Sequence, residues 1–267
     1  MAVNRIIAGK YIKQESPIHR LDPRTKAVGL FTFIAYLLIW PEFTGHVFAV
    51  LILYAVTRVS KFELSMVGRF LWGARFFFYM AFLAHLLFTP GDGGFEWWII
   101  SITTSGAANG LLFGLRLICL LWAAALFGWT TSPVELADGF RKTLPPLRKI
   151  GVNVDDIATM LLLALRFVPT LIQDARELRY AQEARGAKFH RGGVVGKTKS
   201  VVPLVIPLFA GAFRRAEATA VSLIVRGYEL EGERTSLHPL KFRAEDWCGI
   251  LIACLLIFTG IGGRVLL

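Results

Sequence analysis

Residues Gly110–Thr130 read GLLFGLRLICLLWAAALFGWT, an apolar run of 21 residues in which Arg116 is the single charged side chain. A transmembrane helix needs about 20 such residues to cross the hydrocarbon core of a bilayer. Four further apolar blocks lie at Ala27–Trp40, Val47–Thr57, Phe76–Phe88 and Trp247–Gly263. Tilt and local thinning of the bilayer accommodate the shorter blocks. The sequence therefore predicts an all-α, polytopic α-helical membrane protein with four to five transmembrane helices.

The basic residues of this 267-residue chain, whose net charge is +11, are unevenly distributed. Six Lys or Arg lie in residues 1–26, four lie from Arg58 to Arg75, and eighteen lie in residues 133–245. The connections Pro41–His46 and Thr89–Asn109 contain none. Cytoplasmic segments of membrane proteins carry an excess of Lys and Arg. The pattern therefore predicts a multi-pass protein with a cytoplasmic N-terminus, and it explains the positive charge without nucleic acid as a partner.

This charge pattern and the apolar blocks together predict four segments. Residues 1–26 form a cytoplasmic N-terminal lead-in, and residues 27–131 contain the first transmembrane helices. Residues 132–245 form cytoplasmic or interfacial helices, and residues 246–267 form a C-terminal transmembrane helix. The lead-in includes the string SPIHRLDPRTK at residues 16–26, in which either Asp22 or Thr25 is suited to cap the first apolar helix.

The third segment is expected to contain one short and two long helices. Ser132 is suited to cap the short helix, with Pro133 in its first turn. A stretch from Asp155 to Ala184 would form a helix about 45 Å long at 1.5 Å per residue, which exceeds the bilayer core. Its Pro169 predicts a bend, as do the prolines in the helix expected through Val201–Phe213. Two proline-bent helices in or across the inner interface fit these properties.

The two long helices end in similar sequences. The first ends AQEARG, with Arg185 and Gly186, and the second ends SLIVRG, with Arg226 and Gly227. As helix stops, the glycines adopt the left-handed cap and the arginines favour the negative end of the helix dipole. An arginine at a helix tip is equally suited to an acidic groove of a partner, where it makes several charge-assisted hydrogen bonds. Both interpretations remain open from these residues alone.

Other patterns indicate no catalytic residue, no metal site and no cofactor in this chain. The string RGGVVGKT at residues 191–198 approaches a phosphate-binding loop, but Arg191 occupies the position of its first glycine and no strand precedes it. We expect a flexible basic loop there. The three cysteines and five histidines are scattered, without the spacing of metal ligands. Trp97 and Trp98 suit an interfacial anchor in the outer loop.

The sequence resembles the transmembrane T-component of energy-coupling factor (ECF) transporters, a family that includes the cobalt-transport permease CbiQ. The resemblance rests on SPIHRLDPRTK, on SPVELADGFRK at residues 132–142 followed by LALRFVPTL at residues 163–171, and on the paired Arg-Gly helix ends. It covers nearly the whole chain. The second end reads Val-Arg-Gly where the family pattern is most often Ala-Arg-Gly, and this difference leaves the arginine in place.

The resemblance implies a non-catalytic coupling subunit of a prokaryotic cytoplasmic-membrane importer for vitamins or transition metals. Its partners would be two cytoplasmic ABC-type ATPases, which bind the ATP, and one membrane-embedded substrate-binding S-component. Arg185 would dock on one ATPase and Arg226 on the other. The neighbouring residues that would allow close approach are Ala184, Gly186, Val225 and Gly227. The choice of substrate would belong to the S-component.

Two other functions remain as alternatives. A conventional ABC permease subunit would line its own solute path with polar groups, but the predicted spans contain few polar side chains besides Arg75, His85 and Arg116. A polytopic membrane enzyme would need a cluster of carboxylates or histidines in its spans, and the sequence suggests none.

Overall fold

The computed structural model describes residues 11–12, 14–89, 95–97, 100–143, 154–187, 194–228 and 242–266. Contacts between residues divide the chain into two compact units. The first, here called the bundle unit, comprises Met1–Gly139 and Leu240–Leu267. The second, here called the two-helix unit, comprises Phe140–Pro239. The predicted boundaries at residues 26, 131 and 245 concern position relative to a membrane and stay predictions.

The bundle unit is built from helices, as expected. Its helices are α1 (Pro17–Arg20), α2 (Pro23–Ile39), α3 (Phe43–Val59), α4 (Leu64–Gly73), α5 (Arg75–Phe88), α6 (Thr104–Thr130), α10 (Ala244–Leu266) and the first part of α7 (Pro133–Thr143). The expected apolar blocks lie in α2, α3, α5, α6 and α10, which confirms the all-α prediction. One small antiparallel hairpin joins α5 to α6. It pairs β1 (Phe95–Trp97) with β2 (Ile100–Ile102), and Trp98 lies outside the described residues.

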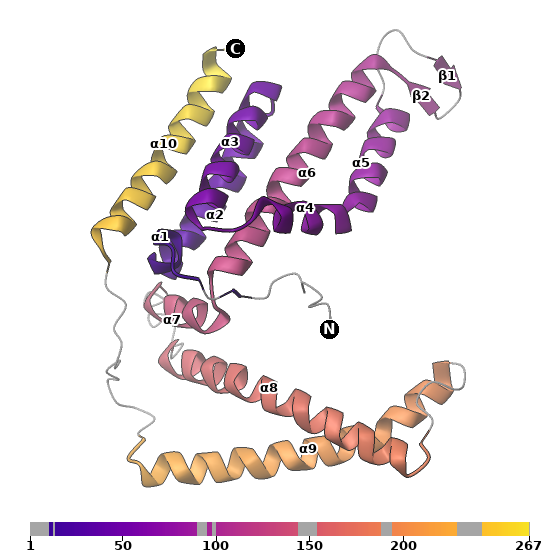
Figure 1. The fold of residues 1–267 in the computed structure, drawn as a ribbon, viewed down its shortest axis with the longest axis vertical. Helices are drawn as coiled ribbons and strands as arrows, with labels where there is room; N and C mark the ends of the chain where they lie inside the picture. The colour runs from indigo at the N-terminus through magenta and orange to yellow at the C-terminus, as the bar shows by residue number, and fades with distance from the viewer. Residues whose placement is uncertain are drawn as a thin grey trace. The chain divides into compact units, whose positions relative to one another are not determined.

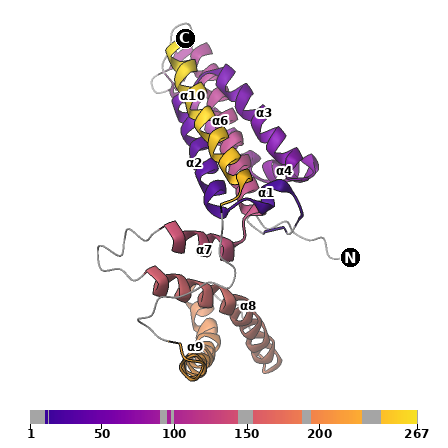
Figure 2. The same cartoon turned by 90° about the vertical axis from the view of Figure 1, so that its left-hand side faces the viewer.

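The core of the bundle unit forms where α2, α3 and α4 pack on α6 (Figure 1). Trp129 and Leu37 are fully buried, and the indole Nε1 of Trp122 donates a hydrogen bond to Thr57 Oγ1 at 3.1 Å. On the other side of α2 lies α10 (Figure 2), which approaches closely because it presents glycine. A Cβ atom on Gly249 would lie 2.9 Å from Thr25 Cγ2, too close for an ordinary contact.

Two helices in the described part of the chain are long and apolar enough to cross a membrane by themselves. They are α6, with 27 residues, and α10, of which Ala244–Gly263 qualifies. Helices α4 and α5 qualify together as one span bent by 58°. Helix α3 is apolar but shorter, and α2 has 17 residues. The structure therefore supports two or three spans by length and composition, and the larger number of four to five stays a prediction.

The N-terminal lead-in is an ordered part of the bundle unit. The Asp22 carboxylate accepts a hydrogen bond from Arg24 N–H at 3.0 Å, so Asp22 and not Thr25 caps α2. The buried ammonium group of Lys26 donates to the carbonyl of Thr130 at 2.9 Å and to that of His19 at 3.1 Å. A cation is favourable at the C-terminal carbonyls of a helix. The lead-in thereby joins the start of α2 to the end of α6.

One buried carboxylate joins the starts of α2 and α10. Asp246 accepts the N–H of Asp22 at 2.7 Å and the N–H of Arg243 at 2.8 Å. Its side chain reaches back to the residue that precedes α10, as in a capping box. The second oxygen serves a different helix, 224 positions away in the sequence. Because two positive helix ends share this acceptor, Asp246 fixes the position of α10 on the bundle.

The two-helix unit consists of α8 (Val154–Ala184), α9 (Val194–Val225) and the end of α7. Ser132 caps α7, accepting the N–H of Val134 at 3.3 Å, as the sequence predicted. Helix α8 continues across Pro169, and α9 continues across its two prolines (Figure 1).

The prediction of a flexible loop at residues 191–198 is wrong for Val194–Thr198, because these residues already belong to α9. The glycine pair Gly192–Gly193 lies outside the described residues. From Val194 onward the local sequence contains no proline until Pro203, so nothing prevents the helix from starting this early.

Replacing Asp246 by Ala removes the acceptor of two backbone N–H groups. Since a hydrogen bond to a charged group contributes about 1.5–3 kcal/mol, we expect the free energy of unfolding to fall by about 3 kcal/mol. Denaturant unfolding of the purified protein in detergent measures this change. The matched control is Glu245→Ala, an exposed acid in the same helical turn, with an expected loss below about 1 kcal/mol. Equal losses for the two variants would contradict the role of Asp246.

Candidate functional site: two equivalent helix ends

The end of α8 has a defined geometry. Gly186 has φ +90°, in the left-handed region, and its N–H donates to the carbonyl of Glu183 at 2.9 Å. The N–H of Ala187 donates to the carbonyl of Gln182 at 2.9 Å. This pair of bonds defines a Schellman motif, which satisfies carbonyls that the helix leaves unpaired. Arg185 is the capping residue, at the last position before the chain turns back.

The end of α9 repeats this geometry bond by bond. Gly227 has φ +76°, and its N–H donates to the carbonyl of Ile224 at 2.9 Å. The N–H of Tyr228 donates to the carbonyl of Leu223 at 3.0 Å. Arg226 is again the capping residue. The helix-stop interpretation of the two glycines is therefore confirmed, because each adopts the left-handed conformation that favours glycine.

Both arginines are exposed at these ends. Within the described part of the chain, neither Arg185 nor Arg226 makes a hydrogen bond or ion pair through its side chain. Ala184 is exposed, and the side chain of Val225 is 81% exposed. A Cβ atom added to Gly186 or Gly227 would meet nothing within 4 Å. Each end thus presents one arginine on an open surface of small or apolar residues.

A helix stop explains the glycines better than it explains the arginines. The left-handed conformation strongly favours glycine, whereas many residues serve as the cap before it. A favourable dipole interaction at an exposed helix end contributes only about 0.3–1 kcal/mol, and Lys would supply it equally well. The planar guanidinium differs from an ammonium group in making directional, bidentate hydrogen bonds to carboxylates. The arrangement is therefore suited to binding an acidic partner surface at each end.

The two ends lie on opposite sides of the helix pair. Helices α8 and α9 run in opposite directions and cross (Figure 1), and Asp174 of α8 pairs with Arg215 of α9 at 2.7 Å. Farther along, Leu178 and Ala181 of α8 line a groove with residues of α9 that precede Arg215. Residues later in α8 therefore lie beside residues earlier in α9, as expected for antiparallel helices. The separation of Arg185 and Arg226 therefore depends on these contacts between α8 and α9.

Helix α9 also presents an exposed apolar face. Its members recur at intervals of three and four residues, which places them on one side of the helix. They are 48–66% exposed: Val202, Ile206, Phe209 and Phe213. A contiguous apolar surface of this kind indicates contact with an apolar partner or with lipid.

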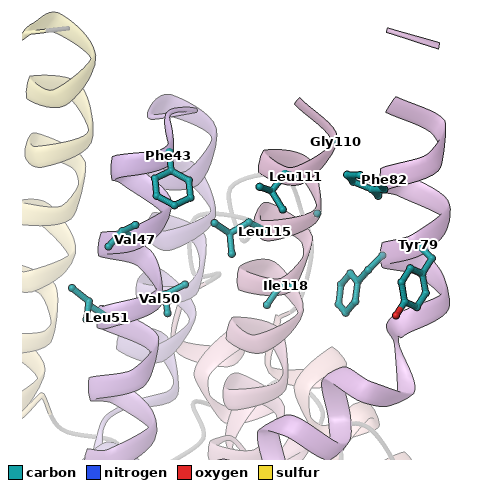
Figure 3. Close-up of a pocket in the computed structure, with 12 residues that line it drawn as sticks. Phe43, Val47, Val50, Leu51, Tyr79, Phe82, Gly110, Leu111, Leu115 and Ile118 are labelled. Carbon is teal, nitrogen blue, oxygen red and sulfur yellow. The ribbon is translucent and has the colours of Figure 1, made fainter. Parts of the chain in front are cut away.

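The bundle unit contains an apolar groove between α3, α5 and α6 (Figure 3). Its volume is about 530 Å³, and the residues that line it include Val50, Tyr79, Phe82, Leu111 and Leu115. The Tyr79 hydroxyl is the one side-chain polar group among its lining residues. Arg116 and His85 are not among them. A polar solute would find almost no hydrogen-bonding partner in this groove.

Within the described ranges, no group of three or more His, Cys, Asp or Glu side chains comes together in a way that could hold a metal ion. Among the cysteines, Cys119 is buried, while Cys248 and Cys254 are exposed.

Sequence reasoning missed the pairing of Asp174 with Arg215. The one signal available beforehand was spacing, because each of these residues precedes the arginine at the end of its own helix by eleven positions. That spacing has meaning only once the two helices are known to cross there.

Comparison with known proteins identifies the family. Residues 14–237 match the family model of CbiQ, described as a cobalt transport protein. The energy-coupling factor transporter transmembrane protein EcfT of Thermosediminibacter oceani is 36% identical over 262 residues, which cover 98% of this chain and 99% of that protein. The EcfT proteins of Lactococcus lactis subsp. cremoris and Staphylococcus aureus are each 34% identical, over 96% and 91% of both chains respectively. The chain therefore belongs to the CbiQ/EcfT family, the transmembrane T-components of energy-coupling factor transporters.

Proposed function

We propose that this chain transmits ATP-driven movement from two cytoplasmic ABC-type ATPases to one membrane-embedded S-component, and so drives import of a vitamin or transition metal. The observation that supports this role is the pair of open helix ends. Each has the same Schellman geometry and presents one exposed arginine, Arg185 or Arg226. Two equivalent ends on one chain match two copies of a similar partner.

Each arginine docks in an acidic groove of one ATPase. A guanidinium buried at the centre of an interface commonly contributes about 2 kcal/mol or more on truncation. Gly186 and Gly227 add no side chain beside the arginine, while Ala184 and Val225 add only small ones, so a partner surface can approach closely. Because the cap fixes the direction in which the chain leaves the helix, the arginine remains at the very tip and moves with the helix axis.

The membrane side of this proposal uses the apolar surfaces of the chain. The exposed face of α9 at Val202, Ile206, Phe209 and Phe213 supplies an apolar contact surface for an S-component. In the bundle unit, α2 and α3 each have 17 residues, about 25 Å at 1.5 Å per residue. This is slightly less than the ~30 Å hydrocarbon core, a mismatch that local thinning accommodates.

Counting α2, α3, the α4–α5 pair, α6 and α10 gives five spans, in a prokaryotic cytoplasmic membrane with the N-terminus on the cytoplasmic side. In this arrangement the chain itself is non-catalytic. The ATPases bind and hydrolyse ATP, and the S-component holds the cargo.

The apolar lining of the groove in Figure 3 favours coupling over a conventional permease subunit, which would need polar groups along its solute path. Purification with neighbouring gene products distinguishes the two functions. One copy of this chain with two ATPases and one small hydrophobic protein supports the coupling role.

Replacing both Arg185 and Arg226 by Ala is expected to abolish uptake by the assembled transporter. Each truncation removes about 2 kcal/mol, or about thirtyfold in affinity for an ATPase. Co-purification of the ATPases and uptake in vesicles measure the two effects. The matched control is Arg176→Ala, which removes an exposed arginine from the same helix, away from its end. Unchanged uptake and co-purification in the double variant would exclude the proposed function.

Replacing Gly186 or Gly227 by Ala tests the cap separately from the charge. The left-handed conformation costs a residue with a Cβ atom about 1–2 kcal/mol, so the last turn unwinds and the retained arginine loses its fixed position. We expect ATPase affinity to fall by about tenfold. Asn tolerates this conformation better, and Gly→Asn variants should keep most of the affinity. If Ala and Asn variants bind equally, the cap geometry does not matter for docking.

A further inference from the structure

An ion pair joins α8 to α9 beside the groove that lies between them. The Nη2 atom of Arg215 lies 2.7 Å from the Oδ2 atom of Asp174, with both side chains about one-third exposed. The two residues are 41 positions apart in the sequence. Neither residue belongs to the sites assigned above.

The position of this pair relative to the two helix ends is symmetrical. Asp174 precedes Arg185 by eleven residues, and Arg215 precedes Arg226 by eleven residues. At 1.5 Å per residue, each arginine tip therefore lies about 16 Å along its helix from the ion pair. Since the helices run in opposite directions, the pair lies midway between the tips. A rotation about this point moves both tips by equal amounts.

An open groove lies beside the contact between α8 and α9. A groove of about 370 Å³ lies between the helices there, where Leu178 and Ala181 of α8 face Leu208 and Gly211 of α9. A Cβ atom on Gly211 would meet nothing within 4 Å. Protein interiors are usually close-packed, and close packing is what fixes the relative position of two helices. The groove leaves part of the contact between the helices without close packing, so the ion pair adds a directional constraint there.

Stability alone does not explain the pair. A partly exposed ion pair contributes about 0–1 kcal/mol. Within the described part of the chain, the other terminal nitrogen of Arg215, Nη1, is buried and has no hydrogen-bond partner, which opposes folding. The pair does restrict the relative orientation of the two helices, because a planar guanidinium bonds a carboxylate in few orientations.

We propose that Asp174 and Arg215 form a clasp that fixes the crossing point of α8 and α9, so that the two arginine tips move as the ends of one body. The proposal rests on the proposed coupling function and adds two positioning residues to it. With the clasp intact, a change in spacing between two ATPases rotates both helices about the crossing. Without it, each tip follows its own ATPase and the helices slide, so ATP is hydrolysed with less transport.

The functional experiment uses the complete transporter with Arg215→Gln, Asp174→Asn and the exchanged pair Asp174→Arg with Arg215→Asp. We expect each single variant to keep its ATPases on purification, because both tips are unaltered. Uptake per ATP hydrolysed should fall by about tenfold, a typical consequence of breaking a contact between coupled residues. The exchanged pair should recover most of the loss. Arg214→Gln is the matched control, since it removes the exposed arginine next to Arg215 and leaves the ion pair with Asp174 intact.

A distance measurement tests the clasp without any transport assay. Spin labels at Tyr180→Cys and Val221→Cys, two exposed positions near the tips, report the separation of the helix ends in the full chain. The background variant carries Cys248→Ser and Cys254→Ser, because both natural cysteines are exposed. We expect one narrow distance distribution, a broad one in Arg215→Gln, and a narrow one again in the exchanged pair.

These experiments separate the clasp from the coupling function. An unchanged distance distribution in Arg215→Gln overturns the clasp, as does unchanged uptake per ATP. Loss of the ATPases in the single variants, or an exchanged pair no better than either single variant, also overturns it. Failure of the coupling function shows instead as ATPases retained by the Arg185→Ala, Arg226→Ala double variant, and the spin-label result still decides whether the clasp exists.

Discussion

A helix leaves backbone groups without partners at both of its ends, and this constraint organises the chain. Hydrocarbon offers no hydrogen bond to a free N–H or C=O group, so a membrane-spanning segment must satisfy its backbone internally and finish its ends carefully. At the starts of α2 and α10, the single carboxylate of Asp246 accepts N–H groups at both ends. At the end of α6, the ammonium group of Lys26 donates to the carbonyl of Thr130. The bundle is therefore held by its ends as well as by its apolar faces.

The same constraint has a different solution in the two-helix unit. Gly186 and Gly227 turn the chain back on itself, so that backbone N–H groups cap the last carbonyls. Since the backbone satisfies itself there, the side chain of the capping residue is free for another use. Arg185 and Arg226 occupy this position and face outward. The need to satisfy backbone groups at helix ends is therefore met by buried side chains in the bundle unit. In the two-helix unit it is met by the backbone itself, which leaves an exposed arginine at each end.

Transmission of movement requires elements that keep their shape and a crossing that keeps its place. A helix of 31 or 32 residues, such as α8 or α9, carries displacement along its axis because its hydrogen bonds run along it. A groove lies beside the contact of α8 and α9, and the ion pair of Asp174 with Arg215 adds a directional contact next to it. The exposed apolar face of α9 is suited to contact with an apolar partner or with lipid.

Local sequence determined much of this protein. The apolar blocks gave the helices of the bundle unit, and caps at Asp22 and Ser132 follow from side chains that reach only two or three residues ahead. The Arg-Gly ends were predictable for the same reason, because a left-handed glycine cap involves six consecutive residues. The early start of α9 at Val194 was not, since nothing in the local sequence excludes either a helix or a loop there.

Only the tertiary structure decided which distant residues meet. Asp246 and Asp22 are separated by 224 positions, and Asp174 and Arg215 by 41, so no local preference brings either pair together. Sequence supplied the charges, but packing selected their partners, because a carboxylate binds whichever donor the arrangement of helices places beside it. The residues at the two helix ends were therefore predictable from the sequence, whereas their relative placement depends on how α8 and α9 pack, because that packing joins residues far apart in the chain.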